Sequence, residues 1–273
     1  MDDQFQGQQS RLSTSLTMKE NPGKVHLPMN YPIRGTTAAL SDIPLWRTEM
    51  TKTGSYSRIP RYDVHVTGVT LSPNQVQYAQ NSCKNLPVEI RLQDYRAVDE
   101  KFDHIVSLGM MEHVGYKNYD TYMKVIRSLL KEKGLFLLQV IGRDTSARKA
   151  DPWINKYIFP DGMLPSIRQI GQAIEKKLVM EDWQNFGPHY DKTLLEWFQN
   201  FDSNWEQLKT RYDDRFYRMW KYYLLCCAGA FRSRTAHLWQ IVLSKNGIPG
   251  GYEPVRVSGM KMGKETGVVS RDA

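Results

Sequence analysis

The sequence predicts an α/β protein with a doubly wound, mostly parallel sheet. Two observations support this fold class. Short apolar runs alternate with segments of helical periodicity from about residue 62 to residue 244, the order of elements that builds a parallel sheet covered by helices. The run at residues 105–108 is apolar apart from one serine, as in a strand buried on both faces. With 273 residues, the chain is long enough for one or two domains.

The first predicted strand covers residues 64–71 and leads directly into a helix signal. Ser72 is the predicted N-cap, and Pro73 stands at the first helical position. Gln75 completes a capping box, in which the cap residue and the third helical residue satisfy each other's backbone N–H groups. We therefore expect a helix to begin at residue 73.

The alternation continues through the middle of the chain. Apolar runs predict strands over residues 88–92 and 104–110. Residues 119–133 have helical spacing, and Gly134 is placed to end that helix. Residues 135–141 then form a further buried strand.

An acidic residue and a histidine follow the strand at residues 104–110. Glu112 and His113 come just after Gly109, where the apolar run stops. In an open α/β sheet, ligands bind just beyond the carboxyl ends of the strands, so this pair is placed for chemistry. A solvated loop with two ordinary polar residues is the alternative that this segment alone leaves open.

Residues 143–177 interrupt the alternation. The stretch is rich in aromatic residues and broken by proline and glycine, which is typical of a lid or a substrate-binding cap. Structural packing of the aromatic side chains is the alternative. After it, the sequence predicts a strand over residues 178–183, helices over about 191–209 and 213–232, and a final strand over 238–244.

The net charge of +8 allows two kinds of partner, nucleic acid or anionic lipid head groups. No zinc-ligand spacing, RNP motif or helix-turn-helix signature occurs in the sequence, so we expect neither a nucleic-acid partner nor a metal site. Attraction to anionic lipid head groups and solubility alone are then the two interpretations of the charge.

Composition and cysteine usage favour a cytoplasmic protein. The longest apolar run, residues 222–231, is far shorter than the roughly 20 residues of a membrane-spanning helix. The first residues are polar and acidic, unlike a secretory signal. Three cysteines, two of them adjacent, do not form a disulfide framework and suit a reducing compartment.

Five motifs follow one another along the chain: GVTLSPNQ (68–75), LQDYR (92–96), DPWINKYIFP (151–160), EDWQNFG (181–187) and CAGAFR (227–232). Together they resemble the catalytic domain of the cyclopropane-fatty-acyl-phospholipid synthase family, over roughly residues 58–246. The resemblance implies a class I S-adenosylmethionine-dependent methyltransferase fold with a helical and aromatic lipid-binding insertion. It implies transfer of a methylene carbon from S-adenosylmethionine to the double bond of an unsaturated phospholipid acyl chain. It further implies peripheral attachment to the inner face of the membrane.

The resemblance also implies a catalytic set that holds bicarbonate as a weak base. Its members here are Glu112, Gln139, Ile141 and Tyr190. Gln139 stands where the family commonly has histidine, and its amide can donate a hydrogen bond but cannot carry a positive charge. Glu112 beside an anion raises a like-charge conflict, so we expect a protonated group to bridge the two.

Nine further residues match the family's cofactor-binding positions for S-adenosylmethionine. They are Thr70, Leu71, Gln75, Gln93, Asp94, Tyr95, Leu108, Gly109 and His113. For His113, a structural hydrogen-bonding role is an equal alternative. Cys227 matches a family cysteine near the active region, and we expect it to act as a small apolar residue.

The resemblance fails at the first strand of the family's sheet. That strand ends in a glycine-rich turn, yet this chain has no G-x-G sequence. The sheet is therefore predicted to be incomplete, with two strand edges unpaired at its centre. Only residues 38–40 and 43–46 could supply a replacement, and both are poor strand sequences. Residues 1–55 are predicted to be an unrelated, mostly disordered segment, 56–246 a partial methyltransferase domain, and 247–273 a disordered tail.

Two alternatives remain for the function. The chain could be a truncated, non-catalytic remnant, or a methyltransferase that acts on another acyl substrate. Because the glycine-rich turn and a central strand are missing, the sequence predicts weak or no binding of S-adenosylmethionine and no detectable cyclopropane lipid. A homodimer is an open alternative for the oligomeric state.

Overall fold

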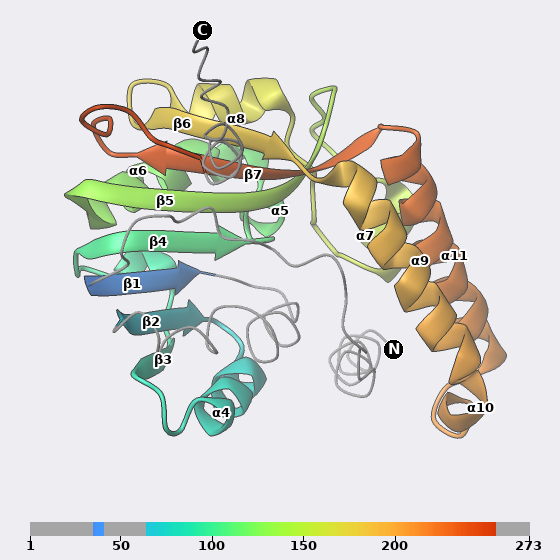
Figure 1. Cartoon of the computed structure of the whole chain (residues 1–273). Helices are drawn as coiled ribbons and strands as arrows, with labels where there is room; N and C mark the ends of the chain where they lie inside the picture. The colour runs from blue at the N-terminus through green and yellow to red at the C-terminus, as the bar shows by residue number, and fades with distance from the viewer. Residues whose placement is uncertain (1–34, 41–63, 255–273) are drawn as a thin grey trace, which may run out of the picture.

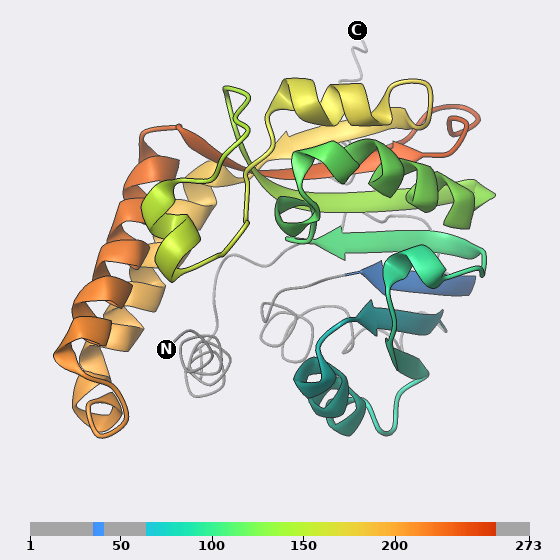
Figure 2. The same cartoon turned by 180° about the vertical axis from the view of Figure 1, so that it is seen from behind.

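The computed structural model describes residues 35–40 and 64–254. These residues form one seven-stranded sheet with helices on both sides (Figures 1 and 2). The order of strands is β3-β2-β1-β4-β5-β7-β6. Of the predicted terminal segments 1–55 and 247–273, only residues 35–40 and 247–254 are described. No helix among the described residues is long and apolar enough to cross a membrane.

Neighbouring strands from β3 to β5 are parallel, and β7 runs antiparallel to β5 and β6. The strands are β1 (Gly35–Leu40), β2 (Val64–Thr70), β3 (Val88–Leu92), β4 (Phe102–Leu108), β5 (Leu130–Arg143), β6 (Val179–Asn185) and β7 (Ala236–Ser244). The predicted mostly parallel, doubly wound sheet is confirmed.

Helices α6 and α8 cover one face of the sheet, while α9 and α11 form an antiparallel pair beyond the carboxyl ends of the strands (Figures 1 and 2). The α-helices are α4 (Pro73–Ser82), α5 (Met111–Val114), α6 (Tyr119–Leu129), α7 (Pro152–Tyr157), α8 (Ile167–Ile174), α9 (Gly187–Ser203), α10 (Trp205–Leu208) and α11 (Asp214–Arg232). Short 3-10 turns lie at Tyr95–Ala97 and Tyr116–Asn118.

The central strand that the sequence was predicted to lack is present, so that prediction is wrong. β1 pairs in parallel with β2 on one side and with β4 on the other. Its sequence, GTTAAL, has low strand propensity. A strand with hydrogen-bonding partners on both edges, however, depends more on its neighbours than on its own propensity. The other candidate run, residues 43–46, lies outside the described residues.

The boundary between α6 and β5 differs from the predicted one. The helix ends at Leu129 instead of continuing to residue 133, and β5 begins at Leu130. Leu130 is fully buried and pairs with Phe102, after which the register of the two strands shifts. Gly134 does not cap a helix. A Cβ atom there would lie 2.9 Å from the backbone oxygen of Lys131, so the close approach of the chain explains the glycine.

The first turns of α4 and α8 differ in how their backbone N–H groups are capped. At α4, the Ser72 hydroxyl accepts from the backbone N–H of Gln75 at 3.4 Å, as predicted. The Gln75 side chain, however, accepts from the Thr70 hydroxyl at 2.6 Å and does not close the predicted box. A complete capping box occurs instead at α8, between Ser166 and Gln169, inside the insert where no helix was predicted.

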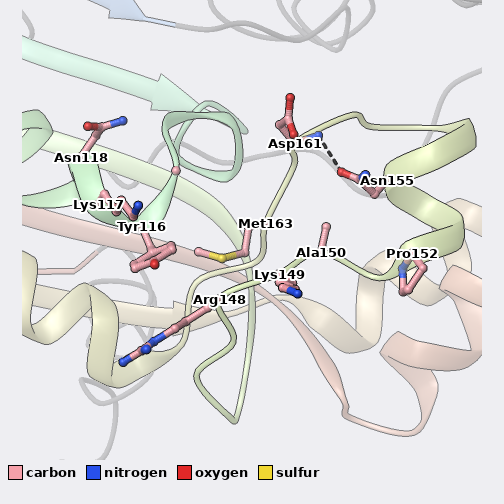
Figure 3. A pocket seen from close by; sticks show the side chains of 11 residues that line it. Tyr116, Lys117, Asn118, Arg148, Lys149, Ala150, Pro152, Asn155, Asp161 and Met163 are labelled. Atoms are coloured by element: carbon pink, nitrogen blue, oxygen red, sulfur yellow. Dashed lines mark hydrogen bonds between the residues drawn. The ribbon is translucent and has the colours of Figure 1, made fainter.

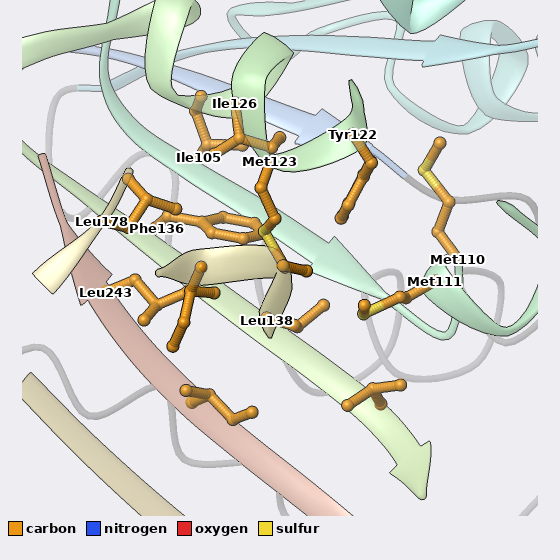
Figure 4. Packing of buried hydrophobic residues seen from close by; sticks show 14 of the residues in the cluster. Ile105, Met110, Met111, Tyr122, Met123, Ile126, Phe136, Leu138, Leu178 and Leu243 are labelled. Atoms are coloured by element: carbon orange, nitrogen blue, oxygen red, sulfur yellow. The ribbon is translucent and has the colours of Figure 1, made fainter. Parts of the chain in front are cut away.

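The main hydrophobic core fills the space between β4, β5 and β7 on one side and α6 and α8 on the other (Figure 4). Ile105 and Phe136 from the strands are fully buried against Met123 and Ile126 of α6. This packing holds the carboxyl ends of β4 and β5 in fixed positions. A second cluster packs α9 and α11 against one another and against the start of β7.

Candidate active site

The predicted site residues converge on the carboxyl edge of the parallel strands. Two backbone hydrogen bonds join the strand ends there. Gln93, just after β3, donates its N–H to the carbonyl of Thr70 at 3.1 Å, and Gly109, just after β4, donates to the carbonyl of Gln139 at 2.9 Å. Gly109 has a φ of +61°, a left-handed conformation that glycine adopts without strain. The chain can therefore turn sharply from β4 into α5, which carries Glu112.

Glu112 is a buried carboxyl group held against the end of β5. Its side chain is 5% exposed. One carboxylate oxygen, Oε1, accepts a 2.7 Å hydrogen bond from the backbone N–H of Ile141. Burial raises the pKa of Glu112 to about 7, and the bond from Ile141 opposes that rise. The Ile141 backbone, expected to contact bicarbonate, is thus engaged by Glu112 itself.

The second oxygen of this carboxyl group, Oε2, has no hydrogen-bond partner among the described residues. The same holds for the hydroxyl of Tyr119, a residue only 3% exposed at the start of α6. Burial and the charge of Glu112 raise the pKa of Tyr119. Unpaired polar atoms at this depth are uncommon and indicate a site for a bound polar group. Tyr119 is not among the predicted site residues, because its only signal in the sequence is a hydroxyl on the buried face of a helix.

Gln139 is oriented by a glutamine on the next strand. Gln240, 3% exposed and directly opposite on β7, donates its side-chain N–H to the Gln139 carbonyl oxygen at 2.9 Å. This bond uses one lone pair of the Gln139 oxygen and involves neither of the two N–H donors of the Gln139 amide. Gln139 and Ile141 are two residues apart on β5, so their side chains lie on the same face of the sheet.

Tyr190 lies on α9 and packs against the second hydrophobic cluster. Its ring contacts Trp197 and Phe231, with centroids 5.8 and 5.0 Å away. It also lies close enough to Tyr223 on α11 to raise the pKa of that residue, although burial is the larger cause. The structure therefore brings Glu112, Gln139 and Ile141 together at the end of β5. Tyr190 and Ile141 both pack against the second hydrophobic cluster.

The insert closes the site between α5 and α11. The Phe159 ring lies between His113 of α5 and Tyr223 of α11, with centroid distances of 5.7 and 6.1 Å. Met163 donates its backbone N–H to the Glu112 carbonyl oxygen at 2.8 Å. The structure thus places the His113 ring against the insert. Burial raises the pKa of Cys227 on α11 to about 12, so this cysteine is a neutral thiol.

The predicted adenine side, Gln93, Asp94 and Tyr95, follows β3, and Leu71 of the predicted ribose and methionine side follows β2. Leu71 and Leu92 are exposed by 61% and 57% there. The Asp94 carboxylate accepts from the Arg96 guanidinium, which lowers the pKa of Asp94. The Tyr95 ring packs edge-on against Tyr122, with centroids 5.7 Å apart. Tyr122 in turn donates to the Ser107 hydroxyl in the core at 2.7 Å, which anchors this wall of the site.

These residues fit the adenosine half of S-adenosylmethionine. Leu92 offers apolar surface for a planar base and Asp94 offers an acceptor for an amino group, while Leu71 stands where the ribose and methionine side is predicted. Leu108, Gly109 and Thr70 lie at the strand ends where the ribose and sulfonium would follow. The residues after β1, where the family's glycine-rich turn is expected, fall in the segment 41–63, outside the described residues.

Comparison with solved structures defines the class of the fold. The cyclopropane synthase MmaA2 from Mycobacterium tuberculosis superposes with a TM-score of 0.67 and 24% identity, covering 88% of this chain and 84% of that one. The mycolic acid cyclopropane synthase CmaA1, solved with SAH and CTAB, gives a TM-score of 0.66 and 25% identity, covering 89% and 85%. The fold is that of class I S-adenosylmethionine-dependent methyltransferases, as predicted.

Residues 53–241 match the family model described as mycolic acid cyclopropane synthetase, and the chain belongs to this family. Over 195 residues it is 53% identical to the cyclopropane-fatty-acyl-phospholipid synthase of Escherichia coli K12, covering 71% of this chain and 51% of that protein. Over 198 residues it is 35% identical to the tuberculostearic acid methyltransferase UfaA1 of Mycobacterium tuberculosis, covering 68% and 46%. The chain thus spans about half the length of these relatives. The predicted family is confirmed.

Proposed function

We propose that this chain transfers a methylene carbon from S-adenosylmethionine to the double bond of an unsaturated phospholipid acyl chain. The observation that carries the proposal is the buried carboxyl group of Glu112, held by Ile141 and left with one oxygen unpaired among the described residues. Its place beyond β4 and β5 is the ligand-binding edge of an open α/β sheet. Family membership and identity to a cyclopropane-fatty-acyl-phospholipid synthase support the substrate class.

The donor, when bound, supplies an electrophilic methyl carbon to the alkene. Ring closure then requires that one proton leave the methylated chain. A weak, precisely held base suits this step, because a strong base would itself be methylated. We propose bicarbonate as that base, and the site has suitable groups to hold it. With its pKa near 7, Glu112 carries a proton on part of the molecules at neutral pH and can donate it to an anion in a hydrogen bond.

Gln139 and Tyr190 complete the proposed anion site. The Gln139 amide is aligned as a donor by Gln240, and the hydroxyl of Tyr190 is a second donor from α9. Tyr119, whose hydroxyl has no hydrogen-bond partner among the described residues, joins the set as a residue that the sequence did not indicate. Donors fixed before the reaction stabilise an anion without reorganisation, and that anion in turn stabilises positive charge developing on the acyl chain.

The cellular setting is proposed on less direct support. The net charge of +8 favours attraction to anionic lipid surfaces, so we propose a cytoplasmic protein that attaches peripherally to the inner face of the membrane. The homodimer stays a prediction. So does the division of the chain at residues 55 and 246.

A non-catalytic remnant is the competing proposal, favoured by the missing G-x-G sequence. The finding that β1 fills the centre of the sheet removes one of the two reasons for expecting an inactive chain. We therefore expect donor binding, weaker by about tenfold or more than in the E. coli relative because contacts of the glycine-rich turn are lost. Ring formation should be detectable at saturating donor.

Titration calorimetry of the full chain with S-adenosylmethionine, and methyl-ester analysis of lipids from cells expressing it, test the proposal together. Glu112→Gln is the matched variant. It should bind the donor as the parent chain does but lose most ring formation. The glutamine amide can donate a hydrogen bond, but it does not ionise and so cannot exchange a proton with the bound anion. Equal loss of donor binding would place Glu112 in the donor site. A parent chain that neither binds donor nor forms rings is a remnant.

A further inference from the structure

A cavity of about 530 Å³ opens between the loop after α5 and the insert (Figure 3). Tyr116 and Lys117 form one wall, and residues 148–150 with Pro152 form another. Met163 lines it as well, and the same residue donates its backbone N–H to the Glu112 carbonyl oxygen. The cavity therefore shares a wall with the candidate active site, although its own lining includes none of the predicted site residues.

The lining of this cavity is cationic. Lys117, Arg148 and Lys149 stand in it against one carboxylate, that of Asp161. In the part of the chain that the structure describes, none of these three cations forms a salt bridge, whereas exposed cations such as Lys131 and Lys124 do. Unpaired like charges around a concave surface focus a positive potential and concentrate anions there. A phosphate group is the ligand that this combination of arginine and lysines suits best.

The rim of the cavity continues into an aromatic patch. Pro152 lines the cavity and begins α7, and the next residue, Trp153, packs against Tyr157 and against Tyr222 of α11, with centroids 5.5 and 4.6 Å apart. Tyr222 is 53% exposed, and Leu225, one turn further along α11, is 37% exposed. Trp153 and Tyr157 are half-buried, so Tyr222 is the exposed ring of this patch. Tryptophan and tyrosine rings beside cationic side chains are typical of surfaces that lie at the head-group level of a bilayer.

We propose that this cavity binds the phosphate of a glycerophospholipid head group, with the aromatic patch of Trp153, Tyr157 and Tyr222 seated in the interface beside it. A lipid held in this way at the shared Met163 wall is positioned to offer its acyl chain to the active site. That last consequence rests on the proposed function, whereas binding of the head group does not. A soluble phosphate ester has the same chemistry, but it gives the aromatic patch no role.

Co-sedimentation of the full chain with vesicles of phosphatidylglycerol and phosphatidylcholine tests the proposal. The variant is Arg148→Glu/Lys149→Glu. The matched control is Lys84→Glu/Lys133→Glu, which reverses two exposed lysines near the amino ends of β3 and β5, at the opposite edge of the sheet. The pocket variant should lose vesicle affinity by about tenfold or more, and the control should change it by less than about threefold. Equal losses, or an unchanged pocket variant, would overturn the proposal.

Two further arms separate the sources of phosphate. Glycerophosphoglycerol, the water-soluble head group, should compete with vesicles for the parent chain and fail to bind the pocket variant. Tyr222→Ser should weaken vesicle binding but leave glycerophosphoglycerol binding unchanged. Glycerophosphoglycerol or inorganic phosphate could bind the cavity while the pocket variant and Tyr222→Ser bind vesicles as tightly as the parent chain does. The site would then be one for soluble phosphates, and the proposal would fail. Titration with S-adenosylmethionine is independent of these results. A chain that binds vesicles through the cavity but binds no donor would support this proposal and contradict the proposed function.

Discussion

Glu112 is the residue whose environment departs furthest from that of an ordinary surface carboxylate. A solvated loop was the alternative for this segment, and the burial of Glu112 at 5% exposure rules it out. The backbone bond from Ile141 at 2.7 Å fixes one oxygen, while the other faces no described partner. Such an arrangement costs folding free energy, because a buried carboxyl group prefers its neutral form. The free-energy cost of ionising the buried Glu112 carboxyl group can therefore be measured from the pH dependence of folding stability.

Stability should fall as pH rises through the range in which Glu112 ionises. The carboxyl group of the unfolded chain loses its proton near the ordinary glutamate pKa of 4.5, whereas that of the folded chain keeps it until about pH 7. Between these values the folded state binds more protons, so increasing pH disfavours folding, by about 3 kcal/mol in total. Glu112→Gln removes this dependence. Its melting temperature should exceed that of the parent chain at pH 8 and approach it at pH 4.5, as measured by thermal circular dichroism.

Gln139 offers a second test at the scale of one residue. Gln139→His restores the commoner family residue and adds a donor that can carry positive charge near the proposed anion. We expect ring formation, measured as cyclopropane methyl esters, to stay equal or rise. Gln240→Leu is the matched control, since it removes the group that orients Gln139 and should lower activity. A Gln139→His chain without activity but with parental donor binding would show that the site has been rebuilt around the amide.

At the scale of the element, the sequence predicted well what depends on local pattern. The strands β2 and β3 lie where apolar runs placed them, β4 begins and ends two residues before its predicted bounds, and α4 begins at Pro73 after its serine cap. The end of α6 was not predictable, because the helical periodicity continues past Leu129 and only the pairing of Leu130 with Phe102 ends it. β1 was missed for the same reason, since its pairing partners lie far away in the chain.

In the candidate site, too, the residues that follow from local pattern or from the family resemblance were predicted, and those that depend on packing were not. The Glu112 position followed from a strand end, and Gln139, Ile141 and Tyr190 followed from the family resemblance. Tyr119 could not be found in this way, because the lack of a partner for its hydroxyl within the described part of the chain is a property of the packed core. The cationic cavity joins Lys117 to Arg148 and Lys149, which lie far apart from it in sequence and are brought together with it only by the fold.

The pairing of β1 predicts a specific sensitivity to proline. Ala39 lies opposite Gly68 on β2 and Val106 on β4. Ala39→Pro removes a backbone N–H from the centre of the sheet and leaves a neighbouring acceptor unpaired, which should cost about 1–3 kcal/mol. Urea unfolding followed by circular dichroism measures the loss. Ala39→Val, which keeps the N–H, should change stability far less, and equal midpoints for all three chains would show that residues 35–40 do not form this strand.

For the whole molecule, the open question is how a methyltransferase sheet binds its donor without a glycine-rich turn. β1 runs parallel to β2 and β4, so its carboxyl end lies at the same edge as Thr70 and Gly109. The chain continues from there into residues 41–46, SDIPLW, which contain no glycine. In this class of sheet, the turn after the first strand lets the backbone approach the donor closely. The affinity of the whole protein therefore depends on the residues that follow one strand end.

Replacing residues 41–46 by a segment of the same length with the glycine spacing G-x-G-x-G should raise affinity for S-adenosylmethionine by about tenfold or more, since each 1.4 kcal/mol of regained contact is roughly a tenfold gain. The matched control has alanine at the three glycine positions. It keeps the length but not the access of the backbone, so it should bind no better than the parent chain. Calorimetry measures both, and cyclopropane methyl esters should rise only with the glycine segment. An equal gain in the control would mean that residues 41–46 merely obstruct the donor, and no gain in either would mean that the chain binds it through contacts other than a turn after β1.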